Sequence, residues 1–150
     1  MTVLSKREFL IVATGAAAAA LAGMPTIALG AEKAEKRVAE FLGGATAKEG
    51  GLSLEMPEIA ENGNTVPLTV RVDGEASADR YAESVLILAD GNPEPGVATF
   101  HFSPLSGTQE ASTRMRLAKT QNVIAVAKMN DGSFMRTDNL VKVTIGGCGG

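Results

Sequence analysis

Hydrophobic residues recur at two different periods along this chain of 150 residues. Between residues 31 and 42 the sequence AEKAEKRVAEFL is rich in helix formers, and four apolar residues fall near one side at helical spacing: Ala34, Val38, Phe41 and Leu42. This spacing predicts a short amphipathic helix. We expect the helix to end at Gly43 and Gly44, because glycine adopts a left-handed C-cap at little cost.

After residue 44 the period falls to about two, which is typical of half-buried strands. In Val66–Val72, for example, apolar residues alternate with Pro67, Thr69 and Arg71. The clearest predicted strands are Val66–Val72, Ser84–Ala89, Val97–Phe102, Ser112–Leu117, Val123–Met129 and Leu140–Ile145, with Leu52–Met56 and Gly132–Arg136 as weaker candidates. Turn residues separate them at intervals typical of a sandwich. The pattern predicts an all-β, immunoglobulin-like β-sandwich preceded by a short N-terminal helix, in one domain spanning residues 31–150.

The first thirty residues have the layout of an export signal. Lys6 and Arg7 precede an apolar run from Phe9 to Gly23, which is too short and too rich in alanine for a membrane-spanning helix. Small side chains in Ala28-Leu29-Gly30 predict cleavage after Gly30. The segment before Phe9 is twin-arginine-like, with Lys6 where the first arginine is expected, and general secretory export is the alternative. Both routes lead to the periplasm and leave no membrane anchor in the mature form.

Composition excludes several classes of function. The formal net charge is −3, and the chain has one Tyr and no Trp, which argues against nucleic-acid binding. With one His and one Cys, the chain lacks the ligands of zinc, haem and blue-copper sites, so we expect no metal and no cofactor. The carboxylates are scattered, and His101 alternates with two phenylalanines on a predicted strand. We therefore assign no catalytic residue.

The one concentrated chemical feature is the tail Gly146–Gly150, whose sequence is GGCGG. Cys148 cannot form an intramolecular disulfide, so its thiol must pair with another molecule, carry a modification or stay free. Four glycines remove every side chain that would crowd it and provide a flexible swinging arm: Gly146, Gly147, Gly149 and Gly150. No cation lies nearby in sequence to lower the thiol pKa. We therefore expect a covalent carrier that partner enzymes act upon, not an enzyme.

Three other interpretations remain open on the residues alone. The domain could be an adhesion or assembly module in which Cys148 forms an intermolecular disulfide. A thiol peroxidase would need a lowered thiol pKa and usually a second cysteine, and neither is visible. An incidental cysteine in a disordered terminus is the third alternative.

Several motifs in order resemble the SoxY family, the sulfur-carrier subunit of the bacterial thiosulfate-oxidising (Sox) system. The resemblance covers nearly the whole predicted mature chain. The motifs are the GGCGG tail, Ile59–Leu68, Asn92–Pro95 with Val97–Phe102, Ser112–Ala118, and Val123–Ala127 before Asp131-Gly132. Lys6 is the one departure from the family's usual twin-arginine signal.

This resemblance implies a heterodimer with a SoxZ-type subunit and thiosulfate-derived sulfur attached at Cys148. A c-type cytochrome sulfur transferase would join thiosulfate to the thiol, and a hydrolase would then release sulfate. The sulfane sulfur left behind would be oxidised, with a sulfane dehydrogenase as a candidate partner, or passed on. For the surface that binds the partner subunit, we expect the exposed side of residues 112–117 or 123–129.

Overall fold

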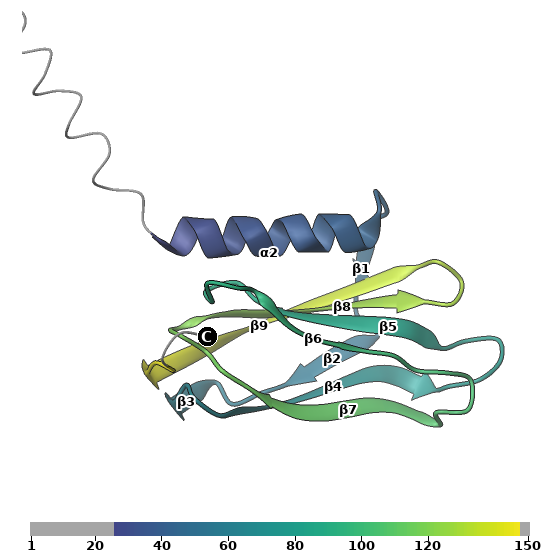
Figure 1. Ribbon diagram of the computed structural model, residues 1–150. Coiled ribbons are helices and arrows are strands. Elements are labelled where there is room, and N and C mark those ends of the chain that lie inside the picture. The colour runs from purple at the N-terminus through teal and green to yellow at the C-terminus, as the bar shows by residue number, and fades with distance from the viewer. Residues whose placement is uncertain (1–25, 148–150) are drawn as a thin grey trace, which may run out of the picture.

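The computed structural model describes residues 26–147. One helix is followed by nine strands in this part of the chain (Figure 1). The elements are α2 (Thr26–Leu42), β1 (Ala47–Glu49), β2 (Leu52–Glu55), β3 (Ile59–Asn62), β4 (Val66–Glu75), β5 (Ala82–Ala89), β6 (Gly96–Phe100), β7 (Thr108–Met115), β8 (Gln121–Met129) and β9 (Phe134–Ile145).

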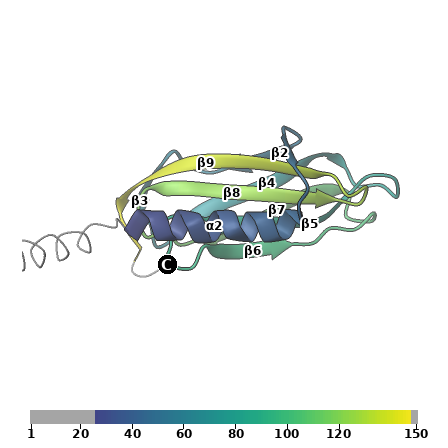
Figure 2. The ribbon, with the colours of Figure 1, turned by 90° about the horizontal axis from the view of Figure 1, so that it is seen from above.

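The strands form two sheets packed face to face. The larger has six strands in the order β1-β9-β8-β5-β6, with β3 also paired to β9, and the smaller has three in the order β2-β4-β7. Figure 1 shows the smaller sheet beneath the larger one, and Figure 2 shows α2 lying along the outer face of the larger sheet. The predicted sandwich with a leading helix is confirmed.

Alternation in the sequence places the core between the sheets. The four valine and leucine side chains at positions 66, 68, 70 and 72 of β4 are each only 1% exposed, while Arg71 between them faces solvent. Strands β5 and β8 are instead buried on both faces, because α2 covers the outer one. Leu88, Ile124 and Val126 form a second apolar cluster there with Ala34 and Val38 of the helix.

The helix ends where predicted but begins earlier. It stops at Leu42 before Gly43 and Gly44, which have φ angles of 58° and 92°. Its first residue is Thr26, so the predicted cleavage point after Gly30 lies inside it, and Gly30 packs against the backbone of Asp90. The rest of the predicted signal, residues 1–25, lies outside the described residues. Within the described part of the chain, no helix is long and apolar enough to cross a membrane.

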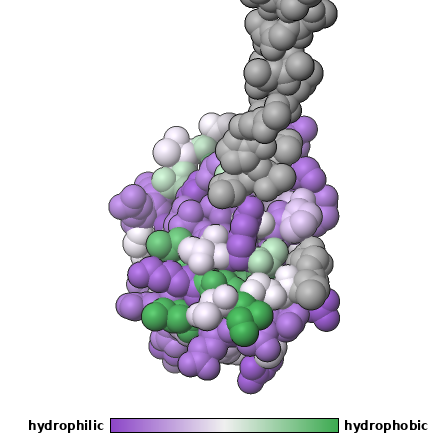
Figure 3. Space-filling model, turned by 90° about the vertical axis from the view of Figure 1, so that its left-hand side faces the viewer, coloured by the Kyte–Doolittle hydropathy of each residue, from purple (hydrophilic) through white to green (hydrophobic). Residues whose placement is uncertain are grey.

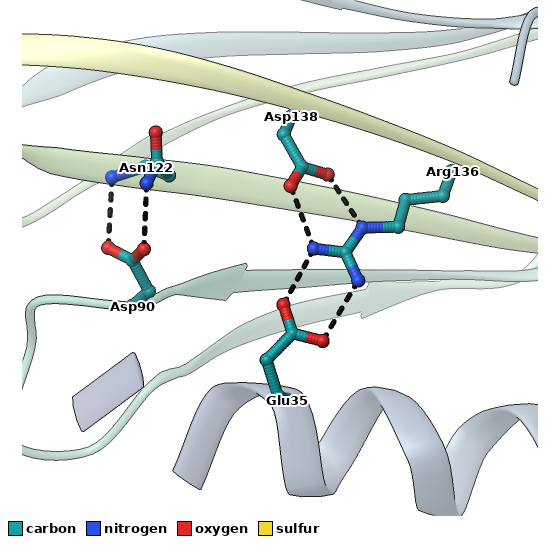
Figure 4. A network of polar contacts seen from close by, with 5 residues as sticks. All are labelled: Glu35, Asp90, Asn122, Arg136 and Asp138. Atoms are coloured by element: carbon teal, nitrogen blue, oxygen red, sulfur yellow. Dashed lines mark hydrogen bonds and ion pairs between the residues drawn. The ribbon is translucent and has the colours of Figure 1, made fainter. Parts of the chain in front are cut away.

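Polar contacts complete the attachment of α2 to the sheet (Figure 4). The guanidinium of Arg136 in β9 donates to both carboxylate oxygens of Glu35 at 3.0 and 2.7 Å and to both of Asp138 at 2.8 and 2.7 Å. These two carboxylates raise the pKa of Arg136 above its already high ordinary value, with Asp138 the larger cause. Arg136 therefore remains charged and fixes the helix over β9.

Two strands were not predicted from the sequence, and most predicted strands differ from the observed ones by a few residues at one or both ends. The short strands β1 and β3 both pair with β9 in parallel, and β9 is one strand where two separate ones were predicted. Strand β7 ends at Met115, two residues earlier than expected. The reason is that the Leu117 amide donates to Gly63 and the Ala118 amide to Asn92, so neither continues the ladder with β4.

Candidate functional site

The predicted tail leaves the sandwich at the end of β9. Strands β3, β5 and β7 finish at the same end, where the loops of residues 62–65, 90–95 and 116–120 gather. We call this end, including those loops and Ile145–Gly147, the arm end. Gly146 and Gly147 belong to the described residues. Cys148, Gly149 and Gly150 lie outside them, so their assignment as attachment residue and swinging arm stays a prediction.

Three backbone hydrogen bonds hold the base of the tail. The Gly63 amide donates to the Ile145 carbonyl at 2.7 Å, the Leu117 amide to the Gly63 carbonyl at 2.8 Å, and the Gly147 amide to the Leu117 carbonyl at 2.9 Å. These bonds link three segments that are distant in sequence, and we refer to them as the backbone clamp. The clamp fixes Gly147, which is itself buried.

Close approach explains why glycine occupies three positions here. A Cβ atom at Gly146 would overlap the Ala118 carbonyl oxygen, and one at Gly147 would lie 2.8 Å from the Gly63 carbonyl oxygen. A Cβ at Gly63 would overlap the Leu117 carbonyl oxygen and lie 2.7 Å from the Gly147 nitrogen. None of the three has a positive φ angle. The glycines at 146 and 147 therefore pack tightly, in addition to the predicted role in flexibility.

A buried polar pair supports the loop that holds the tail. Asn92 is only 4% exposed, and its side chain donates to the Arg116 carbonyl at 2.9 Å while accepting from the Ala118 amide at 3.0 Å. Gln121, equally buried, donates to Asn92 at 2.9 Å and accepts from the Gly91 amide at 2.7 Å. Buried amides satisfied in this way hold a loop in one conformation. The loop presents the Leu117 and Ala118 carbonyls to the tail.

The loop that holds the tail also carries two cationic residues. Arg116 and Lys119 flank the two carbonyls that contact Gly146 and Gly147. Lys119 also lines a cavity of about 390 Å³ with Lys33, Asn92 and Pro93. Lys33 donates to Glu94 at 3.1 Å, whereas Lys119 has no ion pair within the described residues. No cation lies near Cys148 in sequence, but the fold brings a loop that carries two cationic residues into contact with the glycines that precede it.

The remaining candidates lie elsewhere. His101 is exposed, and its Nδ1 lies 3.2 Å from the Glu83 carbonyl oxygen near the start of β5, at the opposite end of the sandwich. Within residues 26–147 there is no group of three or more His, Cys, Asp and Glu side chains that could hold a metal ion.

The two surfaces expected to bind a partner are polar or covered. On β7, Ser112 bonds to Thr69 at 2.8 Å, and Arg114 lies 3.4 Å from the Thr65 hydroxyl. Strand β8 is buried along most of its length. The assignment of these surfaces to a partner stays a prediction. Large exposed hydrophobic side chains occur at four described positions: Ile59, Leu105, Leu140 and Ile145, with exposed fractions of 59%, 96%, 55% and 66%. Apolar residues gather on the arm end, which faces the viewer in Figure 3.

Four residues that build this site were not predicted from the sequence: Gly63, Asn92, Leu117 and Gln121. The run Glu61-Asn62-Gly63-Asn64 is typical of a turn, and Asn92 falls in another, so both were assigned to connections. Only the tertiary arrangement shows that Gly63 contacts the tail and that Asn92 supports the loop of residues 116–120 beside it.

Comparison with known proteins gives one family. The model of the family "Sulfur oxidation protein SoxY" matches residues 38–148, ending at the candidate cysteine. The solved structure of the sulfur carrier protein SoxY from Chlorobium limicola f thiosulfatophilum is 35% identical, with a TM-score of 0.64, covering 77% of this chain and 99% of that one. No curated protein matches the chain significantly.

More distant solved structures share the fold alone. Superoxide reductase (neelaredoxin) from Ignicoccus hospitalis is 16% identical with a TM-score of 0.55, covering 63% of this chain and 80% of that one. A putative superoxide reductase from Thermotoga maritima is 16% identical with a TM-score of 0.53, covering 65% and 93%.

Proposed function

Because the chain belongs to the SoxY family of sulfur oxidation proteins, we propose that it is a carrier that holds sulfur intermediates covalently on Cys148. The observation that carries this proposal is the family match, which runs through the sandwich to Cys148 itself. The relative with 35% identity is named a sulfur carrier protein. The clamped base of the tail adds support, because it presents the cysteine from a fixed point at one end of the domain.

The chemistry follows from the thiol and from the partners that the family resemblance implies. The Cys148 thiol and thiosulfate lose two electrons and one proton together, forming a sulfur–sulfur bond and leaving cysteine S-thiosulfonate. A c-type cytochrome enzyme accepts the electrons. Water then cleaves the bond to the sulfonate group in a hydrolase, which releases sulfate and a proton and leaves a persulfide on Cys148. The carrier contributes attachment and presentation, and the partner enzymes contribute catalysis.

The loop beside the tail suits an anionic cargo. Both thiosulfate and the cysteine S-thiosulfonate are negatively charged, and Arg116 and Lys119 flank the carbonyls that contact the tail glycines. Cations near the path of a charged substrate raise its local concentration, an effect that salt weakens.

The proposal places the mature protein in the periplasm as a heterodimer with a SoxZ-type subunit. The signal-like residues 1–30 support export. Mixing the purified mature chain with the SoxZ-type subunit should give a single heterodimer peak in size-exclusion chromatography. Two separate monomer peaks would contradict this part of the proposal.

Replacement of Cys148 with Ser tests the carrier function directly. With thiosulfate and the partner enzymes, the wild-type protein should support sulfate release and Cys148→Ser none. The matched control is Ser103→Ala, which changes one hydroxyl in the exposed loop after β6. Sulfate release by Cys148→Ser at the wild-type rate would contradict the proposal and favour an assembly role for the cysteine.

A further inference from the structure

Strand β9 has an open stretch along the edge that faces away from β8. This edge pairs with two short parallel strands, β1 along residues 134–136 and β3 along residues 142–145. Between them, residues 137–141 pair only with β8 among the described residues. The gap is roughly 17 Å long, since each strand residue advances about 3.3 Å. It arises because the chain leaves the larger sheet after β1, forms β2 in the smaller sheet and returns as β3 (Figure 1).

Backbone groups in this gap lack a strand partner among the described residues. The Lys142 amide donates at 2.9 Å to the carbonyl of the residue before β3, so it points to the outer edge. Successive residues of a strand point their backbone groups to opposite edges, so those of Asp138 and Leu140 also point outward. The pairing with β8 agrees, because Asn122, opposite Leu140, accepts from the Asp90 amide and so points toward β5. Two N–H and two C=O groups are therefore available to an added strand.

The gap opens into two cavities that meet at Asp138. One, of about 430 Å³, adjoins β3, and the other, of about 600 Å³, adjoins β1. The cavity next to β3 is lined by Ile59 and Leu140, which are both more than half exposed. Ile59 lies opposite Lys142, so its side chain is on the same face of the sheet as those of Leu140 and Arg136. An apolar side chain of a bound segment would contact Ile59 and Leu140 together.

The cavity next to β1 is acidic. Its lining includes Glu49, which has no ion pair within the described residues. Arg136 also lines it but is already bonded to two carboxylates, so the group carries an excess of negative charge. In the other cavity the opposite charges of Glu58 and Lys142 offset each other. The gap therefore favours a segment with a cationic residue near β1 and an apolar residue near β3.

The closed ends of the gap limit what can fill it. Strand β9 of a second copy has 12 residues and would collide with β1 and β3, so the gap fits an extended terminus or loop. An uncovered sheet edge beside exposed apolar side chains promotes aggregation, which favours an occupant that stays bound. A permanent subunit covers the edge at all times, whereas enzymes that act in turn leave it open between encounters.

We propose that the SoxZ-type subunit inserts an extended segment into this gap, where it adds a strand to the larger sheet between β1 and β3. The segment bonds to the backbone of Asp138 and Leu140. It places an apolar side chain against Ile59 and Leu140 and a cationic side chain beside Glu49. This inference rests on the heterodimer of the proposed function.

Leu140→Asp tests the apolar contact, and Leu105→Asp is its matched control. Leu105 is exposed in the loop after β6, which lies at the opposite edge of the larger sheet. Circular dichroism should be the same for both variants and the wild-type chain. Calorimetric titration with the SoxZ-type subunit should give a dissociation constant about tenfold higher for Leu140→Asp and an unchanged one for Leu105→Asp. Equal affinity of Leu140→Asp and the wild-type chain would overturn the inference.

Glu49→Lys tests the charge of the gap, and Glu75→Lys at the end of β4 is its control. Glu49→Lys should weaken binding of the SoxZ-type subunit several-fold at low ionic strength, and the difference should shrink as salt is added. Equal affinities of the two variants at every salt concentration would overturn the assignment of a cationic side chain beside Glu49.

Hydrogen exchange tests the added strand without any substitution. The amides of Asp138 and Leu140 should exchange about tenfold or more slowly in the heterodimer than in the free chain, because each gains a backbone partner. A heterodimer that leaves both amides unprotected would overturn the inference and leave the carrier function intact. Protection in the free chain that rises with its concentration, or protection by a sulfur-processing enzyme alone, would assign the gap to another occupant and overturn it. Absence of any complex would refute the proposed heterodimer, and the inference with it.

Discussion

The Gly147 amide donates a hydrogen bond to the carbonyl oxygen of Leu117 at 2.9 Å, although thirty positions separate the two residues in sequence. This bond joins the last described residue of the tail to the loop after β7. It fixes the backbone at Gly147, the residue before the candidate cysteine in sequence.

Gly63→Ala should destabilise the domain by about 1–3 kcal/mol, because a methyl group has no room beside the Leu117 carbonyl. Urea unfolding measures the loss. Gly43→Ala is the control: it is strained by its φ angle of 58° but has no atom near the added Cβ. Gly43→Ala should also lower stability, yet leave turnover at Cys148 unchanged. Equal effects of the two variants on turnover would contradict a specific role for Gly63.

Asn92→Ala should lower the free energy of unfolding by about 1–3 kcal/mol, since it leaves buried partners such as the Ala118 amide without a hydrogen bond. Thermal unfolding of the variant provides the measurement. Asn122→Ala is a matched control, because its side chain bonds to Asp90 at the surface and should cost less. If Asn92→Ala lowered the unfolding temperature no more than Asn122→Ala does, the buried pair of Asn92 and Gln121 would not support the loop.

Lys119→Glu should slow the attachment of thiosulfate by several-fold at low ionic strength, because it reverses a charge in the loop that contacts the base of the tail. Rates measured at rising salt concentration should converge with those of the wild-type protein, since salt screens exposed charges. Lys48→Glu, a charge reversal on β1 and away from the arm end, serves as the control. A Lys119→Glu rate equal to wild type at every salt concentration would show that the loop does not attract the anion.

The turn between β8 and β9 supplies a pH-dependent contact far from the tail. The Ser133 hydroxyl and amide donate to Asp131 at 2.6 and 2.8 Å, and these bonds lower the pKa of that carboxyl below its ordinary value. The stabilisation is therefore present above the unfolded-state pKa and is lost as pH falls through the folded-state pKa. In an NMR titration, Ser133→Ala should raise the pKa of Asp131. An unchanged pKa would show that the hydroxyl has no such effect.

The sandwich could be predicted from the sequence because its strands alternate strongly. In β4 each apolar residue faces the core and each intervening residue faces outward, so the period of two is visible without tertiary information. The helix and its C-terminal end were also predictable, since the helical spacing of the apolar residues stops at Leu42 and two glycines follow. Its early start at Thr26 was not, because residues 26–30 resemble the end of an export signal.

Strand β3 and the clamp depend on contacts that local patterns do not encode. Strand β3 (Ile59–Asn62) has only four residues and leads into a turn-like sequence. It is a strand only because it pairs with β9 in parallel. Gly63 resembles an ordinary turn glycine until the fold brings Leu117 and Gly147 beside it. Cys148 could be singled out from the sequence because it is the one cysteine of the chain and has glycines on both sides. The backbone clamp at Gly147 could not, because it depends on residues distant in sequence.

Intact mass spectrometry of the mature protein tests the central claim most directly. The protein is isolated from its native host during growth on thiosulfate and measured without reductant and again with it. The carrier function predicts reductant-labile mass increments made of sulfur, or of sulfur and oxygen, that map to Cys148 and are absent from Cys148→Ser. A single unmodified mass, or only a disulfide-linked dimer, would contradict the carrier function.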